Sequence, residues 1–179
     1  MTALLLCLVA AEPIAIVNAH IVPVSSPTIE RGTILLRDGK ISAVAARVAV
    51  PKDARKIDGA GLSVYPGWVN AYTALGLAEI ASVRGATDTT ELGPFNPQAQ
   101  AWIAVNPHNE FVRTARANGV TSALVAPAGG RISGTASVMN LFGLYPNEMA
   151  IENRAGVVIE IPSESGRGGR GTRGGTADG

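Results

Sequence analysis

The sequence predicts an α/β chain in which a small antiparallel β-domain precedes βα units of a parallel sheet. Two observations support this prediction. Short apolar runs separated by turn residues fill residues 14–65, and a strand, a helix and a second strand follow one another after Pro66. Tight turns join antiparallel strands, whereas parallel strands need a longer crossover such as a helix. The 179 residues leave room for one ordinary domain or two small ones.

Residues 1–13 contain an apolar run that ends in Ala10-Ala11, before Glu12-Pro13. Small residues at this point are typical of a short export signal with a cleavage site. No Lys or Arg precedes the run, so a buried strand is the alternative. We expect a periplasmic or secreted protein if the signal is real and a cytoplasmic one otherwise. The run is too short to span a bilayer, so no stable membrane insertion is expected.

Residues 14–65 predict the small antiparallel β-domain. Its clearest element is the pair Asp38-Gly39, which separates the apolar runs 33–37 and 40–44. Both residues of a two-residue hairpin turn adopt positive φ angles, and Asp-Gly tolerates them well, so we expect a hairpin. A second turn at residues 58–61 leads into another short strand.

After Pro66 the pattern changes to that of βα units, which we expect to occupy residues 66–162. Residues 68–72 are typical of a strand, and residues 87–100 are typical of a long polar loop. The later apolar run at residues 156–161 predicts a further strand.

A helix is expected between the polar loop and Gly119. Asn106 is the expected N-cap, Pro107 suits the first helical position, and Gly119 suits a left-handed end. The buried-type run 120–126 follows directly. A strand, a helix and a strand at this spacing predict a βαβ unit and hence a parallel pair.

The Gly/Arg-rich residues 163–179 show no apolar periodicity and are expected to be disordered. Arg-Gly repeats also occur in RNA-binding segments, but this one has no aromatic residue on which a base could stack. The net charge of +1 lacks the basic excess of proteins that bind phosphate backbones. A flexible linker is the favoured interpretation, and no nucleic-acid partner is expected.

Cysteine and histidine are scarce in this sequence. Cys7 is the one cysteine, and His20 and His108 are the two histidines. A single cysteine excludes an internal disulfide framework and a thiolate zinc cluster. Two imidazoles this far apart in sequence are poor material for a histidine-rich metal centre.

One run, DGAGLSVYPGWVN at residues 58–70, leads through Pro-Gly into the first predicted strand of the second region. This run resembles the amidohydrolase superfamily, and within it the imidazolonepropionase-like branch. Residues 116–121 (RANGVT) resemble that family's approach to its second barrel strand, and residues 129–134 (GGRISG) resemble a loop of one bacterial subgroup. The resemblance covers residues 14–162. It implies a composite β-domain followed by the first βα units of an incomplete (β/α)8 TIM-type barrel.

The resemblance also implies an activity, which is the metal-dependent hydrolysis of C–N bonds other than peptide bonds in small molecules. In that family one or two divalent metals, usually zinc, activate water. Two histidines at alternating positions of the first strand point to one face and share the metal. Here the motif falls on Asn70, Tyr72 and Ala74, with Tyr72 and Ala74 at the two histidine positions. A methyl group cannot coordinate, and a phenol with a pKa near ~10 is a poor zinc ligand at neutral pH. We therefore expect no metal cofactor in this chain.

A complete barrel of this class needs about 250 residues, more than follow Pro66 in this sequence. We therefore expect an N-terminal fragment that is inactive on its own. The alternative is a non-catalytic subunit that pairs with a second, downstream barrel fragment. The open sheet edges of a partial barrel also favour self-association.

Four polar residues are weaker candidates for a substrate loop. Asp88 and Glu91 fall on the first predicted βα loop, which lies on the functional side of such barrels. His108 lies near the predicted helix start, where an imidazole can bind an anion or act as a base. Ser133 lies in the glycine-rich run 129–134, which has backbone N–H groups suited to a phosphate but matches no nucleotide-binding fingerprint. A solvated loop or a tolerated surface residue is the simpler alternative in each case.

Overall fold

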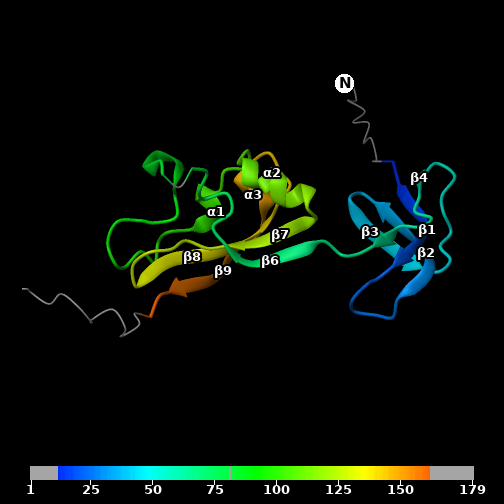
Figure 1. Cartoon of the computed structure of the whole chain (residues 1–179), viewed down its shortest axis with the longest axis horizontal. Helices are drawn as coiled ribbons and strands as arrows, with labels where there is room; N and C mark the ends of the chain where they lie inside the picture. The colour runs from blue at the N-terminus through cyan, green and yellow to red at the C-terminus, as the bar shows by residue number, and fades with distance from the viewer. Residues whose placement is uncertain (1–11, 81, 162–179) are drawn as a thin grey trace, which may run out of the picture. The chain divides into compact units, whose positions relative to one another are not determined.

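The computed structural model describes residues 12–80 and 82–161. The chain divides between Pro66 and Gly67 into two compact units (Figure 1). The run expected to be an export signal lies outside the described residues except for its last two positions, and the Gly/Arg-rich tail at 163–179 lies wholly outside them. Within the described ranges, no helix has the length and apolar character needed to cross a membrane.

The first unit is a five-stranded mixed sheet. Its order is β3-β2-β1-β4, and β5 also pairs with β1. The strands are β1 (Ile14–Ile21), β2 (Ile29–Arg37), β3 (Lys40–Ala45), β4 (Arg55–Asp58) and β5 (Ser63–Val64).

The directions of these strands correct the expectation of a purely antiparallel domain. β2 is antiparallel to both β1 and β3, whereas β4 and β5 run parallel to β1. β4 and β5 follow one edge of β1 in succession, separated by the turn at residues 58–61. Gly59 in this turn lies so close to β1 that an added Cβ would stand 2.8 Å from the Cβ of Ala19. The close approach explains a glycine at that point of the turn.

The hairpin between β2 and β3 is confirmed. Asp38 and Gly39 have φ angles of 51° and 72°, as a two-residue hairpin turn requires. Arg37 and Lys40 on either side of the turn are paired. The small core of this sheet clusters around Ala19, Ile21 and Ile34.

The second unit is a four-stranded sheet with the order β6-β7-β8-β9. The strands are β6 (Trp68–Thr73), β7 (Val120–Val125), β8 (Ile132–Asn140) and β9 (Ala150–Ile159). The helical segments are the 3₁₀ turn η1 (Arg84–Ala86) and the helices α1 (Ala101–Ala104), α2 (Glu110–Ala117) and α3 (Pro146–Met149).

The βαβ prediction is confirmed, because β6 and β7 are parallel and α2 lies between them in the chain. The helix itself starts later than expected. Its N-cap is Asn109, whose side chain accepts a hydrogen bond from the backbone N–H of Phe111, and neither Asn106 nor Pro107 is helical. Gly119 adopts the expected left-handed conformation, with φ of 87°.

Beyond β7 the structure departs from a run of βα units. β8 includes the end of a run expected to be a loop, and the strand expected at 156–161 is the second half of the longer β9. Both pairings, β7 with β8 and β8 with β9, are antiparallel. The named strands of the second unit, within the described residues, therefore form one parallel pair, β6 with β7, and an incomplete (β/α)8 barrel is not confirmed.

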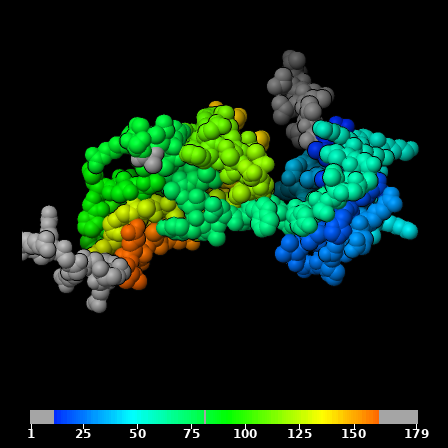
Figure 2. Space-filling model, in the orientation of Figure 1, coloured from blue at the N-terminus to red at the C-terminus, as the bar shows by residue number. Residues whose placement is uncertain are grey.

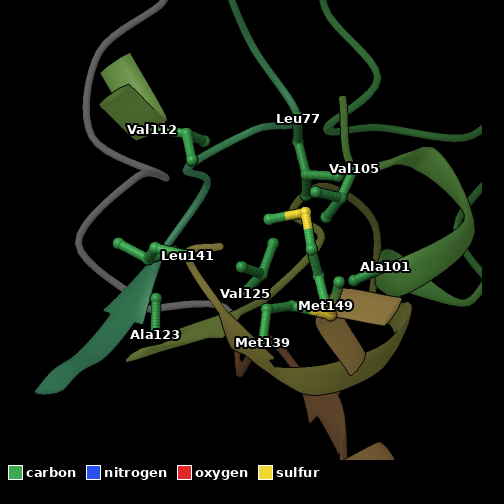
Figure 3. Packing of buried hydrophobic residues seen from close by; sticks show 9 residues of the cluster. All are labelled: Leu77, Ala101, Val105, Val112, Ala123, Val125, Met139, Leu141 and Met149. Carbon is green, nitrogen blue, oxygen red and sulfur yellow. The ribbon is translucent and has the colours of Figure 1, made fainter. Parts of the chain in front are cut away.

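The core of the second unit lies on one face of its sheet. The side chains of Ala123 and Val125 from β7 and Met139 from β8 point into it (Figure 3). Residues from the β6–β7 connection and from the end of β8 onwards complete the cluster: Leu77, Ala101, Val105, Val112, Leu141 and Met149. The edge strands are more exposed, and the atoms of β9, orange in Figure 2, lie at the surface.

Candidate functional site

The end of β6 is the position at which the resemblance places metal ligands. Tyr72 is 62% exposed and lines a hollow of about 350 Å³ together with Leu124, Ala136 and Val158. The backbone N–H of Tyr72 donates to the Asn70 side-chain oxygen at 3.3 Å, so Asn70 is occupied in a local turn. The hollow therefore presents a phenol among mostly apolar side chains.

The residues of this strand do not fit a divalent metal ion. Ala74 has no coordinating side-chain atom, and the Tyr72 phenol is not among the usual zinc ligands, which are Cys, His, Asp and Glu. In the described part of the chain, no three His, Cys, Asp or Glu side chains are grouped closely enough to hold a metal. No hydrolytic step through a metal can be derived from these residues.

Asp88 and Glu91 lie on the connection between β6 and β7, as the sequence indicated. Both are exposed and line a small pocket of about 30 Å³, with Thr89 and Thr90 between them and Pro127 opposite. The loop is not free: the Asp88 N–H donates to Leu77 O at 2.7 Å. Neither carboxylate lines the hollow beside Tyr72. The structure therefore does not bring Asp88 and Glu91 together with Tyr72.

Ser133 belongs to a cluster that the sequence did not reveal. Its side chain is buried in β8, and its hydroxyl donates to Glu160 Oε1 at 3.4 Å. The same oxygen accepts the backbone N–H of Gly129 at 2.8 Å. Glu160 also lines the hollow beside Tyr72. Glu160 was missed because it lies 31 positions beyond Gly129, and only the antiparallel β8–β9 pairing, which the sequence did not predict, brings them together.

The glycine-rich run 129–134 has a structural explanation. An added Cβ at Gly130 would stand 2.9 Å from Pro94 O, and one at Gly134 would stand 2.8 Å from Ala99 O. Backbone N–H groups in this region donate to the same segment, as the Ile132 N–H does to Pro94 O at 3.0 Å. The glycines therefore let residues 94–99 lie against the start of β8, and the N–H groups of Gly129, Arg131 and Ile132 are already used in hydrogen bonds.

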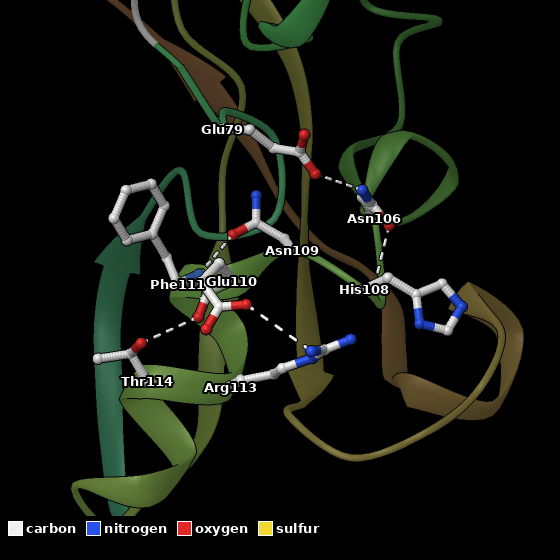
Figure 4. Close-up of polar contacts among 8 residues, drawn as sticks. All are labelled: Glu79, Asn106, His108, Asn109, Glu110, Phe111, Arg113 and Thr114. Carbon is white, nitrogen blue, oxygen red and sulfur yellow. Dashed lines mark hydrogen bonds and ion pairs between the residues drawn. The ribbon is translucent and has the colours of Figure 1, made fainter.

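His108 is exposed and lies just before α2 (Figure 4). Its backbone N–H donates to the side chain of Asn106, which also contacts Glu79. The neighbouring Asn109 is fully buried: its amide donates to Ala78 O at 2.9 Å while its oxygen caps α2. Asn109 therefore ties the segment after β6 to the helix, and the His108 ring forms no hydrogen bond or ion pair with any residue that the structure describes.

No known family model matches the sequence, and no curated protein sequence matches it. Among solved structures, the chain is similar to an amidohydrolase from Thermotoga maritima MSB8, with a TM-score of 0.75 and 28% identity. The match covers 82% of this chain but 38% of that one, so this chain spans well under half the length of that structure. The chain has an amidohydrolase-like fold.

Two further structures are similar over a smaller part of the chain. One is a prolidase complexed with N-methylphosphonate-L-proline, with a TM-score of 0.33, 16% identity and coverage of 37% of this chain and 17% of that one. The other is described as a prolidase from Bifidobacterium longum, with a TM-score of 0.34, 23% identity and coverage of 63% and 23%. These likenesses are too weak to carry an argument about this protein.

Proposed function

We propose that this chain is an amidohydrolase-like protein of the imidazolonepropionase-like branch whose first strand does not bind a metal. We further propose that this polypeptide does not by itself hydrolyse the C–N bonds that metal-dependent relatives act on. The observation that carries the proposal is the pair of side chains at the end of β6, Tyr72 and Ala74. The family's chemistry needs two coordinating groups at these alternating positions.

The residues around Tyr72 support the same proposal. The hollow beside it is lined by aliphatic side chains and by one carboxylate, that of Glu160. Glu160 already accepts two hydrogen bonds through Oε1, from Gly129 and from Ser133. A single carboxylate beside a phenol is too small a ligand set for a structural or catalytic zinc ion, which takes three or four protein ligands.

A zinc measurement on matched variants tests this proposal. The unmodified chain, incubated with zinc and passed through a desalting column, should retain no stoichiometric metal by elemental analysis. Replacing both positions with histidine (Tyr72→His with Ala74→His) supplies two imidazoles on alternate positions and should raise retained zinc above that baseline. Tyr72→Phe is the matched control and should behave like the unmodified chain, because it removes only the hydroxyl.

Hydrolysis of a panel of N-acyl amino acids and lactams, followed by release of amine or carboxylate, completes this test. We expect no turnover above a heat-denatured sample. Stoichiometric zinc in the unmodified chain together with zinc-dependent turnover would refute the proposal.

A second candidate function is that of a non-catalytic subunit, and the edge strands of the second sheet favour it. Trp68 and Val69 on β6 and Val157 and Ile159 on β9 are all more than half exposed. An edge strand with exposed apolar side chains and unpaired backbone groups is a surface on which another strand can add. The partner would be a second barrel fragment or another copy of this chain.

Light scattering coupled to size exclusion tests the second candidate. Association through the β6 edge should give a mass above that of the monomer, and Val69→Lys should reduce it because a lysine discourages strand addition. Val24→Lys, at an 80% exposed position of the first unit, is the matched control and should leave the mass unchanged. A folded monomer for the unmodified chain, with no complex on co-expression with the downstream reading frame, would exclude this candidate.

A further inference from the structure

Three hydroxyl groups alternate along β8 and therefore share one face of the sheet. Ser133, Thr135 and Ser137 are all at least nine-tenths buried, with Thr135 at 8% exposure. The Ser137 hydroxyl donates to Asn153 O at 2.8 Å, and the Ser133 hydroxyl donates to Glu160. The Thr135 hydroxyl between them forms no hydrogen bond with any described residue. Thr135 is thus the member of this row whose hydroxyl has no partner among the described residues, whereas Ser133 and Ser137 each have one.

The Thr135 side chain lines a hollow of about 320 Å³. Among the described residues, every fully buried side-chain nitrogen or oxygen has a hydrogen-bond partner. The Thr135 hydroxyl must therefore be reached from the hollow. The hydrogen-bonding capacity of this hydroxyl is therefore open to water or to a ligand that enters the hollow.

The other polar groups around the hollow are also hydrogen-bond donors or amides. Gln98, Gln100 and Arg154 line it, and its wall contains no carboxylate. The Gln100 side-chain oxygen already accepts the Trp102 indole N–H at 3.0 Å. Its amide nitrogen is therefore the group left for a ligand. Arg154 forms no ion pair within the described ranges, so its guanidinium charge is uncompensated there.

A bulge in β9 explains how Arg154 comes to this hollow. Ala136 pairs with Gly156 and Val138 pairs with Glu152, so three residues of β9 oppose the single residue between them on β8. Extra residues of this kind bend the strand and redirect side chains, and bulges are common beside binding sites. Arg154 is the middle residue of this bulge.

We propose that this hollow binds a small organic carboxylate. Arginine presents two parallel N–H groups that match the two oxygens of a carboxylate, and such charge-assisted bonds are the stronger ones. The Thr135 hydroxyl and the Gln100 amide donate to the same group. The proposal does not depend on the function proposed above, because neither Tyr72 nor Ala74 lines this hollow.

Titration of the purified chain with succinate tests the proposal, with succinamide as an uncharged molecule of nearly the same shape. Binding is followed by the backbone amide signals of Gln100 and Thr135 in ¹H–¹⁵N spectra and by Trp102 fluorescence. Succinate should give saturable shifts at these positions and succinamide should not. Arg154→Gln should weaken succinate binding at least about tenfold, and Thr135→Val about three- to tenfold, as expected for charge-assisted hydrogen bonds.

Two controls separate binding from folding. Arg131→Gln removes an exposed arginine that does not line the hollow and should bind succinate like the unmodified chain. Thr135→Val keeps the shape of the side chain and removes no protein hydrogen bond, so its unfolding midpoint should stay within a degree or two of the original. Absence of saturable succinate binding, or equal affinities for Arg154→Gln and Arg131→Gln, would overturn the proposal.

Discussion

The two units of the chain are stabilised in different ways. The second unit clusters nine buried hydrophobic residues on one face of its sheet, whereas the first clusters three, Ala19, Ile21 and Ile34. Burial of apolar surface is the dominant favourable term in folding, so the first unit has less of it available. Two sheets of similar strand number can therefore depend on different interactions. Mutations in the second unit should act mainly through lost packing, and mutations in the first unit mainly through its turns and polar contacts.

The first unit also contains a network of polar side chains that joins its strands. Arg31 donates twice to the Asn18 side-chain oxygen, at 3.1 and 2.9 Å, and Asn18 donates to Asp58 at 3.0 Å. The backbone N–H of Ala60 donates to the same Asp58 oxygen at 3.2 Å. Asn18 has a φ of 60°, a conformation that Asn tolerates better than most residues. The network therefore joins β1, β2 and the turn after β4.

The largest expected effect is in the core of the second unit. Leu77 is 2% exposed within the cluster, and Leu77→Ala should lower the free energy of unfolding by about 2–5 kcal/mol, through lost burial and the cavity left behind. Urea unfolding followed by tryptophan fluorescence measures it, because both tryptophans, Trp68 and Trp102, belong to the second unit.

The matched control lies on the exposed side of the same unit. Tyr72→Ala removes a larger side chain, but Tyr72 is mostly exposed, so the change should stay below about 1 kcal/mol. An equal loss for Leu77→Ala and Tyr72→Ala would contradict the assignment of the core to one face, and would show that the face bearing Tyr72 is covered in solution.

A smaller effect is expected where the polar loop lies against β8. Gly134 has a φ of 132°, and an added Cβ would stand 2.8 Å from Ala99 O. Gly134→Ala should therefore destabilise the second unit by about 1–3 kcal/mol, since backbone must move and the conformation is strained for alanine. Gly156→Ala on β9 is the control: nothing lies within 4 Å of its added Cβ, so stability should be unchanged or slightly raised. If the two variants unfold alike, residues 94–99 do not lie against β8 in solution.

The sequence predicted the elements whose signals are local. Asp38-Gly39 specified a hairpin through two backbone angles, and Gly119 marked the end of α2. The N-cap was placed three residues early because Asn106 and Asn109 are the same residue type, and the choice between them depends on Ala78, a partner far away in sequence. Local chemistry could not separate these two positions.

The missed parts of the fold and site depend on long-range pairing. β8 begins with Ile-Ser-Gly-Thr, which has too little apolar character to predict a strand. Further along β8, the Ser137 hydroxyl donates to Asn153 O and accepts the Trp102 backbone N–H, contacts that the local sequence does not specify. The parallel direction of β4 and β5 likewise depends on which edge of β1 remains free. The resemblance alone named Tyr72 and Ala74 as degenerate ligand positions, whereas the site proposed at Thr135 and Arg154 has no such landmark in the sequence.

The smallest expected effect is the pH dependence contributed by the polar network of the first unit. The side-chain hydrogen bond from Asn18, and then that from the Ala60 N–H, hold the pKa of Asp58 below its ordinary value. A carboxyl group whose pKa is lower in the folded state stabilises the fold above its unfolded pKa of ~3.9, and that contribution is lost as the pH falls through the folded value. Acid should therefore weaken the first unit through this group.

Asp58→Asn should flatten that part of the stability-versus-pH profile of the first unit, measured by hydrogen exchange of β1 amides from pH 6 down to 3. Asp53→Asn, an exposed residue outside the network, should leave the profile as it is. Superimposable profiles for the unmodified chain and Asp58→Asn would show that the network does not help to hold β1 and the turn after β4 together.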